Sequence, residues 1–284
     1  MKLAVCNELF EGWAFDRICR FARSAGYSGL EIAPFTLATP ITEVSASRRA
    51  ELRGHAADAG VEIVGLHWLL AKTDGLHVTS PDRAVRERTA EYLIALAEAC
   101  HDLGGHVMVF GSPKQRSLLS GVSQDQALEL ATDTFRQAMP FVAAFDVTIC
   151  MEPLTPAETD FVTTVADAVR LIDAVGHPSF GLHLDVKAMS SESTPVPDLI
   201  RQHAGRAGHF HVNDANGRGP GFGDTNFVPI LQALDDAGYD RWMSLEVFDF
   251  TPDPETIALK AVEYLRTCVA MTARGAEDVR RARL

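Results

Sequence analysis

Short apolar segments alternate with longer amphipathic segments along the whole chain. The short segments have the length and the aliphatic, β-branched character of buried strands. They cover residues 3–6, 29–32, 62–67, 106–110, 147–152, 180–185, 209–212 and 243–247. Between them, apolar residues recur at helical spacing, as in Tyr92, Ala95, Leu96 and Ala99. This alternation predicts strand–helix units around a parallel sheet.

The predicted helices cover residues 13–24, 45–59, 82–103, 124–144, 163–175, 195–206, 226–238 and 254–273. Several of them are followed by a glycine that suits a left-handed C-cap, namely Gly26, Gly60, Gly104, Gly176 and Gly238. Eight units in 284 residues average about 35 residues each, which is typical of a closed (β/α)₈ TIM barrel. We therefore predict one barrel domain over residues 1–273 and a charged tail over residues 274–284.

An open, doubly wound sheet is the alternative arrangement of the same units. That fold places a G-x-G-x-x-G phosphate-binding turn after its first strand. The turn here reads Asn7-Glu8-Leu9-Phe10 and lacks this motif. The closed barrel is therefore the favoured fold.

Composition and charge indicate which kinds of molecule the protein is unsuited to bind. The chain is 46% hydrophobic and 23% charged, as in globular proteins, and its net charge of −12 disfavours nucleic acid and anionic membranes. The five cysteines are widely spaced and form no C-x-x-C pair, which fits a reducing compartment rather than a disulfide framework. With neither a signal peptide nor an apolar membrane-spanning segment, the sequence predicts a cytoplasmic protein without nucleic-acid or membrane partners.

Four consecutive predicted strands end in side chains that can bind a metal. These are Glu152, Asp185, His211 and Glu246, separated by 33, 26 and 35 residues, each about one strand–helix unit. Because all strands of a barrel deliver their last side chains to the same mouth, we expect these groups to meet there. A carboxylate-rich set with one imidazole suits one divalent ion, with Mn²⁺ preferred and Mg²⁺, Co²⁺ or Zn²⁺ as alternatives.

The second half of the chain resembles the xylose isomerase-like TIM barrels of the sugar phosphate isomerase/epimerase family, particularly the ketose 3-epimerases. The motifs that carry the resemblance are Glu152-Pro153-Leu154, Glu158-Thr159-Asp160-Phe161, Leu184-Asp185, His209-Phe210-His211-Val212, Pro220-Gly221-Phe222-Gly223 and Ser244-Leu245-Glu246. The resemblance implies that Glu152, Asp185, His211 and Glu246 hold one divalent metal, and that Glu152 and Glu246 also move protons.

Such a site can remove and return a proton through an enediolate stabilised by the metal. Return to the same carbon from the opposite face is epimerisation, and return to the neighbouring carbon is aldose–ketose isomerisation. The two glutamates alone do not separate these reactions. The expected substrate is a small carbohydrate or a carbohydrate derivative.

Further polar residues near the predicted strand ends are candidates for substrate binding. The resemblance assigns this role to Glu158, while His67, Trp68 and Lys114 follow predicted strands 3 and 4, and Glu31 belongs to predicted strand 2. A tryptophan at a barrel mouth can stack on a sugar ring.

The chain departs from the ketose 3-epimerases at two positions. Ala188 stands where they usually carry a histidine, and Gly217 stands where they usually carry an arginine. Lys187 or Arg218 can replace these contacts, or each can be a surface charge. Losing a partner for a sugar hydroxyl changes specificity, so we expect a substrate other than a free ketohexose.

Three other functions are weighed against the epimerase or isomerase. A dehydratase or lyase acting on a 3-oxo sugar or an inosose uses the same metal and base, and it is the main alternative. A non-catalytic sugar-binding module is less favoured because both glutamates are retained. An apurinic endonuclease is disfavoured because Ala188 and Asn226 replace expected histidines and the chain is acidic. The apolar segment 248–250 makes a homo-oligomer possible.

Overall fold

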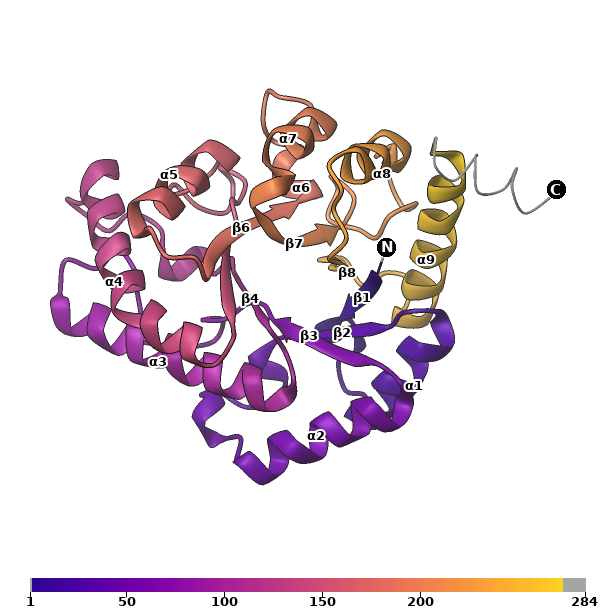
Figure 1. Cartoon of the computed structure of the whole chain (residues 1–284), viewed down its shortest axis with the longest axis horizontal. Helices are drawn as coiled ribbons and strands as arrows, with labels where there is room; N and C mark the ends of the chain where they lie inside the picture. Colours follow the sequence, from indigo (N-terminus) through magenta and orange to yellow (C-terminus); the bar gives the residue numbers. More distant parts are fainter. Residues whose placement is uncertain (1, 273–284) are drawn as a thin grey trace.

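The computed structural model describes residues 2–272, which form a closed barrel of eight parallel strands (Figure 1). The strands are β1 Lys2–Cys6, β2 Gly29–Ile32, β3 Glu62–Leu66, β4 Val107–Phe110, β5 Thr148–Met151, β6 Phe180–Asp185, β7 Ala207–Val212 and β8 Trp242–Leu245. Each strand pairs with the next one in the sequence, and β8 closes the ring by pairing with β1. The predicted single-domain (β/α)₈ barrel is therefore confirmed.

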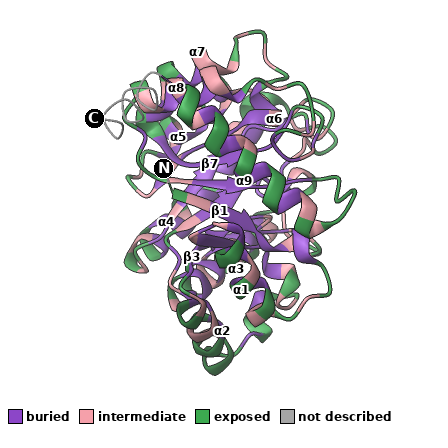
Figure 2. Ribbon diagram, turned by 90° about the vertical axis from the view of Figure 1, so that its right-hand side faces the viewer, coloured by how far each residue is buried: buried purple, intermediate pink, exposed green. Residues whose placement is uncertain are grey.

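Helices surround the barrel on its outside (Figure 1). They are α1 Phe15–Ala25, α2 Ala46–Ala59, α3 Arg83–Leu103, α4 Gln124–Ala144, α5 Val165–Val175, α6 Val186–Met189, α7 Val196–His203, α8 Phe227–Asp236 and α9 Pro254–Met271. Figure 2 shows the strands buried and the outer faces of the helices exposed. Helix α4 illustrates the pattern, since it buries Ala131, Phe135 and Val142 at helical spacing against the barrel. These inward faces form one continuous apolar core with the strands.

The ends of the elements differ from the prediction by a few residues. Strands β3, β5 and β8 end at Leu66, Met151 and Leu245, one or two residues before the predicted ends. The backbone N–H groups of His67 and Glu152 still donate to the neighbouring strands, to the carbonyl oxygens of Ile32 and Phe110. Helix α7 ends at His203, since the next residues tighten into the short 3₁₀ helix η5 Ala204–Arg206. Helix α9 ends at Met271, and the predicted tail, residues 274–284, lies outside the described residues.

One short helix was not predicted. Helix α6 starts directly after β6, and the Asp185 carboxylate accepts a hydrogen bond from the backbone N–H of Ala188 at 2.7 Å, as an N-cap does. The glycines predicted to end helices are confirmed: Gly26, Gly60, Gly104 and Gly176 cap their helices in the left-handed conformation. Gly238 is also left-handed, with φ of 68°, and directly follows Ala237, the C-cap of α8.

Polar side chains occupy the interior of the barrel toward the carboxyl ends of β6 and β7. Residues two apart on a strand face the same side. His183 and Asp185 on β6 lie beside His209 and His211 on β7 in the strand register, and all four are buried. Barrel interiors are more often filled by bulky branched residues. The fold therefore concentrates titratable groups at one end of the barrel.

A buried arginine ties the end of β5 to the loop that follows it. Arg116 is fully buried, and its guanidinium donates to the carbonyl oxygens of Glu152 at 2.5 Å and Val162 at 3.2 Å. Burial lowers the pKa of Arg116 to about 10, against the opposing effect of the Glu152 and Glu158 carboxylates. Arg116 thus remains a cation at neutral pH and fixes the backbone of Glu152.

All five cysteines are buried and free, as small apolar residues would be. Across residues 2–272, every helix is too short or too polar to cross a membrane.

We expect Arg116→Ala to lower the free energy of unfolding by roughly 3 kcal/mol, because two buried carbonyl groups lose a charged donor. Urea denaturation followed by circular dichroism measures this loss. The matched control is Arg83→Ala, whose exposed side chain pairs with Glu87 one turn away. The control should change the same free energy by less than about 0.5 kcal/mol. Equal effects of the two substitutions would contradict the anchoring role of Arg116.

Candidate metal centre at the barrel mouth

The four predicted metal ligands come from consecutive strands and meet at the mouth of the barrel. Glu152, Asp185 and His211, together with His183, each offer an atom within 4.8 Å of the others. Glu246 adjoins them, since its Oε2 lies 3.1 Å from His211 Nδ1. We call these five buried residues the mouth cluster.

The carboxylates of the mouth cluster shift one another's pKa values because they are buried close together. Burial, reinforced by Glu246 and Asp185, raises the pKa of Glu152 well above its ordinary value. Burial and then Glu246 raise the pKa of Asp185 to about 6. Burial acts in the same direction on Glu246, but His211 outweighs it and lowers the pKa of that carboxyl. The cluster therefore holds more acidic groups than its own positive charge can balance.

His211 lies between two carboxylates. Its Nε2 is 3.3 Å from both carboxylate oxygens of Glu31, while its Nδ1 faces Glu246. Burial works to lower the pKa of His211, but Glu246 and Glu31 outweigh it and raise the pKa well above its ordinary value. A metal-binding histidine commonly donates its second N–H to a carboxylate, which fixes the ring. Glu31 thus holds His211 with Nδ1 toward the mouth cluster.

Glu31 itself is fully buried and belongs to β2, on the other side of the barrel interior. His209 Nε2 lies 2.7 Å from Glu31 Oε2 and 3.0 Å from the Ser244 hydroxyl. Burial raises the pKa of Glu31, but His209 and His211 outweigh it and hold the pKa well below its ordinary value. From the sequence alone, Glu31 was predicted only to be a polar residue of the second strand. A glutamate inside the otherwise apolar strand Gly29–Ile32 was the available signal.

His183 is the second residue of the site that sequence reasoning missed. It is fully buried, its Nε2 lies 3.9 Å from Glu152 Oε1, and neither ring nitrogen has a hydrogen-bond partner. Burial, followed by His211 and His209, lowers the pKa of His183 well below its ordinary value, so the ring is neutral. Its position two residues before Asp185 on the same strand was the signal, because both side chains face the barrel interior.

The donor set of the mouth cluster fits a divalent cation. Three carboxylates and two imidazoles, one of them neutral with unpartnered nitrogens, are oxygen and nitrogen ligands of the kind that such ions bind. A cation among them would also offset the repulsion that raises the pKa of Glu152 and Asp185. The residues that could hold it are Glu152, His183, Asp185, His211 and Glu246.

Among the predicted substrate-binding residues, His67 and Trp68 border the mouth cluster. His67 is buried, and its Nε2 lies 2.8 Å from Oε2 of Glu8, a residue that sequence reasoning did not single out for the site. The indole N–H of Trp68 donates to Glu246 Oε1 at 2.8 Å. The backbone of Trp68 has φ of 52°, an uncommon conformation for a bulky residue that is often found at functional sites.

Glu158 and Lys187 form an ion pair at the rim. Lys187 Nζ lies 2.7 Å from Glu158 Oε1 and 4.5 Å from the centre of the Phe248 ring. Burial raises the pKa of Glu158, but hydrogen bonds from Lys187 and Thr155 outweigh it and lower the pKa. Ala188, the next residue along α6, is buried and brings no polar side chain to the site.

Lys114 and Arg218 are placed less favourably for substrate contact. Lys114 is exposed on the short helix η4 Pro113–Gln115. Arg218 donates to the carbonyl oxygen of Thr251 at 2.9 Å and lies 3.4 Å from Asp249, so it binds the loop after β8. The structure therefore does not bring these two side chains to the mouth cluster.

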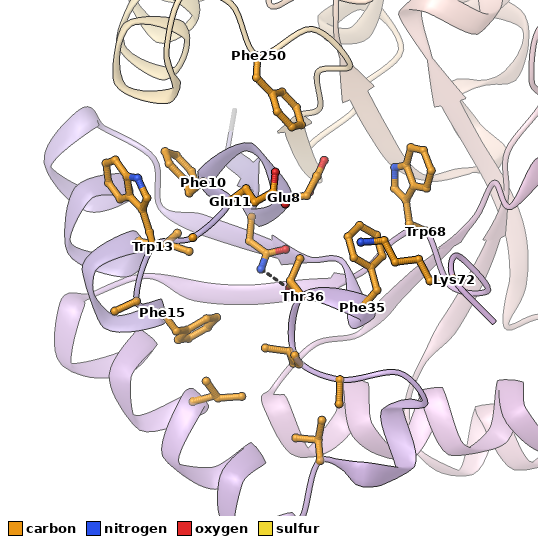
Figure 3. Close-up of a pocket in the computed structure, with 18 of the residues that line it drawn as sticks. Glu8, Phe10, Glu11, Trp13, Phe15, Phe35, Thr36, Trp68, Lys72 and Phe250 are labelled. Carbon is orange, nitrogen blue, oxygen red and sulfur yellow. Dashed lines mark hydrogen bonds between the residues drawn. The ribbon is translucent and has the colours of Figure 1, made fainter.

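A pocket of about 690 Å³ opens beside the mouth cluster (Figure 3). Glu8 and Trp68, which hydrogen-bond with His67 and Glu246, both line it. The remaining wall comes largely from the segments that follow β1, β2 and β8, and Figure 3 shows the Phe250 ring pointing into the pocket. The five residues of the mouth cluster do not themselves line this pocket, so Glu8 and Trp68 form the border between the pocket and the cluster.

Comparisons with known proteins agree with this architecture. L-ribulose 3-epimerase of Mesorhizobium japonicum is 28% identical over 184 residues, which are 64% of this chain and 62% of that protein, less than two thirds of its length. D-psicose 3-epimerase of Ruminiclostridium cellulolyticum is 25% identical over 225 residues, 78% of this chain and 74% of that protein.

A solved structure extends the likeness to the whole fold. The apo form of 3-keto-D-glucoside 4-epimerase from E. coli superposes with a TM-score of 0.82, at 19% identity, over 94% of this chain and 100% of that one. At this identity the superposition speaks for the fold alone.

Residues 19–268 match the model of the family described as xylose isomerase-like TIM barrel. This match covers most of the chain, and the named relatives support an isomerase or epimerase enzyme. Taken with the closed barrel, it shows that the chain belongs to the xylose isomerase-like TIM barrel family.

Proposed function

We propose that this protein is a divalent-metal-dependent epimerase or isomerase of a sugar or sugar derivative, with Glu152 and Glu246 as the acid–base pair. The observation that carries the proposal is the mouth cluster, in which these two glutamates share a buried space with Asp185 and His211. Two carboxyl groups beside one substrate are what proton removal and return require.

The two glutamates are held differently, which suits different steps of proton transfer. Both carboxylate oxygens of Glu246 are engaged, one by Trp68 and the other by His211, so this group is oriented. Within residues 2–272, the carboxylate of Glu152 has no hydrogen-bond donor, while Arg116 fixes its backbone. Glu152 can therefore turn toward a carbon-bound proton, and Glu246 can meet the substrate in a fixed position.

Glu152, Asp185, His211 and Glu246 would hold the cation, with His183 close enough to join them. When bound, a divalent cation supplies stabilisation of the negative charge that develops on substrate oxygens. The low dielectric of the buried site strengthens that interaction.

The substrate class follows from the relatives and from two positions near the site. The relatives are named as epimerases of ketoses and of a 3-dehydro-D-guloside. Ala188 offers no hydrogen bond from its side chain, and Arg218 is occupied by Thr251 and Asp249. In a free ketohexose, a terminal CH₂OH group lies next to the carbonyl carbon. A sugar that lacks this group beside its carbonyl carbon fits these positions best. These same positions keep a metal-dependent lyase acting on an oxidised sugar as the second candidate.

We expect the protein, stripped of metal and reloaded with Mn²⁺, to exchange a carbon-bound proton of a keto sugar in D₂O. Ketoses, inososes and 3-oxo glycosides form the panel, and NMR follows deuterium uptake and products. Glu152→Gln and Glu246→Gln should each lower the exchange rate by about 10² to 10⁴, the usual contribution of a positioned acid or base.

The control for this experiment is Glu129→Gln, an exposed position on α4, which should leave the rate unchanged. Loss of a substituent from the substrate would identify the lyase instead. A protein that exchanges no proton across the panel, with metal bound, would contradict both catalytic proposals.

Metal binding can be tested without any substrate. We expect Mn²⁺ at about 100 times its Kd to stabilise the fold by about 2.7 kcal/mol and to raise the Tm by about 5 °C or more. Asp185→Asn should abolish most of this shift and lower the metal content measured by mass spectrometry, because a charged ligand is lost while an asparagine still caps α6.

The matched control is Asp82→Asn, since Asp82 caps α3 through the Ala84 N–H at 2.9 Å. It should retain the full metal-induced shift. A shift that survives Asp185→Asn unchanged would remove Asp185 from the metal site.

A further inference from the structure

The pocket beside the mouth cluster extends well beyond the reach of the cluster. Its outer part lies between the segments after β1 and β2, the start of α1 and the loop after β8 (Figure 3). We call this part the outer pocket, defined by the following side chains: Trp13, Phe15, Phe35, Val44, Leu52 and Phe250.

The walls of the outer pocket are apolar, and four of its six residues are aromatic. Trp13, Phe15 and Phe35 are each partly exposed, so their rings have free surface. Phe250 is 37% exposed on the loop after β8, so its ring also has free surface. Free aromatic surface around a hollow is suited to a flat apolar ligand group.

Charged residues line other parts of the same pocket. Glu11, Glu43, Arg48 and Lys72 are exposed, and Lys72 Nζ lies 4.2 Å from the centre of the Phe35 ring. Mainly apolar walls with a few polar groups are typical of pockets that bind small organic molecules.

The size of the pocket also exceeds what one sugar ring needs. Its volume of about 690 Å³ falls in the range of pockets that enclose drug-sized ligands, about 300 to 1,000 Å³. A free pentulose or hexulose at the mouth cluster would leave the outer pocket unfilled. Its distal hydroxyls would also face the mainly apolar side chains of the outer pocket, where few hydrogen-bond partners replace water, and this costs binding free energy.

Glu8 and Trp68 join the pocket to the mouth cluster. Both residues line the pocket, and they hydrogen-bond with His67 and Glu246, respectively. A sugar held at the mouth cluster can therefore extend a substituent past Glu8 and Trp68 into the outer pocket.

We infer that the substrate is a glycoside with an aromatic aglycone, and that the aglycone binds in the outer pocket. This inference rests on the proposed function for the position of the sugar ring. It names a substrate class, an oxidised glycoside of a flat apolar alcohol, and it assigns Phe35 and Phe250 as residues that determine specificity.

The first test measures binding and needs no turnover. The Mn²⁺-loaded full chain is titrated by calorimetry with phenyl β-D-glucopyranoside and with methyl β-D-glucopyranoside. Burial of the phenyl ring should make the phenyl glycoside bind at least about tenfold more tightly. Quenching of tryptophan fluorescence should accompany its binding, since Trp13 and Trp68 both line the pocket.

Substitutions in the outer pocket test whether the preference for the phenyl glycoside arises there. Phe35→Ala and Phe250→Ala should each reduce the preference for the phenyl glycoside by about threefold or more, while affinity for the methyl glycoside stays the same. The matched control is Phe141→Ala, because Phe141 is 56% exposed on α4 and does not line the pocket. It should keep the full preference.

The outcomes separate this inference from the proposed function. Equal affinity for the two glycosides overturns the aglycone site even if keto sugars exchange protons. A phenyl preference that Phe35→Ala and Phe250→Ala reduce supports the site even if no keto sugar exchanges. A dimer in sedimentation that Phe250→Ala dissociates, together with equal affinities, would make the outer pocket an interface between two copies and would overturn the inference.

Discussion

Negative charge buried at the barrel mouth governs the arrangement of the side chains around it. Burying an ionised carboxylate is costly unless hydrogen bonds or opposite charges compensate it. His211 compensates two of them at once, Glu31 through Nε2 and Glu246 through Nδ1. Asp185 receives hydrogen bonds from the Ala188 N–H and from Asn213 at 2.6 Å, whereas Glu152 receives the least help and has the most strongly raised pKa of these acids. A cation held among these groups would offset this imbalance.

The sequence predicted the fold well because both of its signals are local. Apolar runs of strand length and helices ending in glycine repeat at a nearly constant interval, and that interval alone specifies eight units. The same regularity placed Glu152, Asp185, His211 and Glu246 at equivalent points of successive strands. The structure brings these four residues together because parallel strands of a barrel deliver equivalent positions to one end.

The periodicity of the sequence could not predict contacts that cross the barrel or depend on loops. Glu31 meets His209 and His211 across the interior, and the meeting depends on strand tilt and stagger, which periodicity does not encode. His183 was not predicted because only the last residue of this strand, Asp185, was considered as a metal ligand. Arg218 turned out to bind the loop after β8, since the direction of a loop side chain depends on tertiary contacts.

The pairing of β1 with β8 also constrains how the protein is made. Synthesis on the ribosome proceeds from β1 toward β8, so the hydrogen-bonding edge of β1 must wait for a partner that is translated last. Long-range pairing of this kind is slow and leaves strand edges open until closure. Glu31 emerges early and Glu246 late, yet both hydrogen-bond with His211. The barrel mouth is therefore assembled after translation of the last strand, and a nascent chain is exposed to misassociation until then.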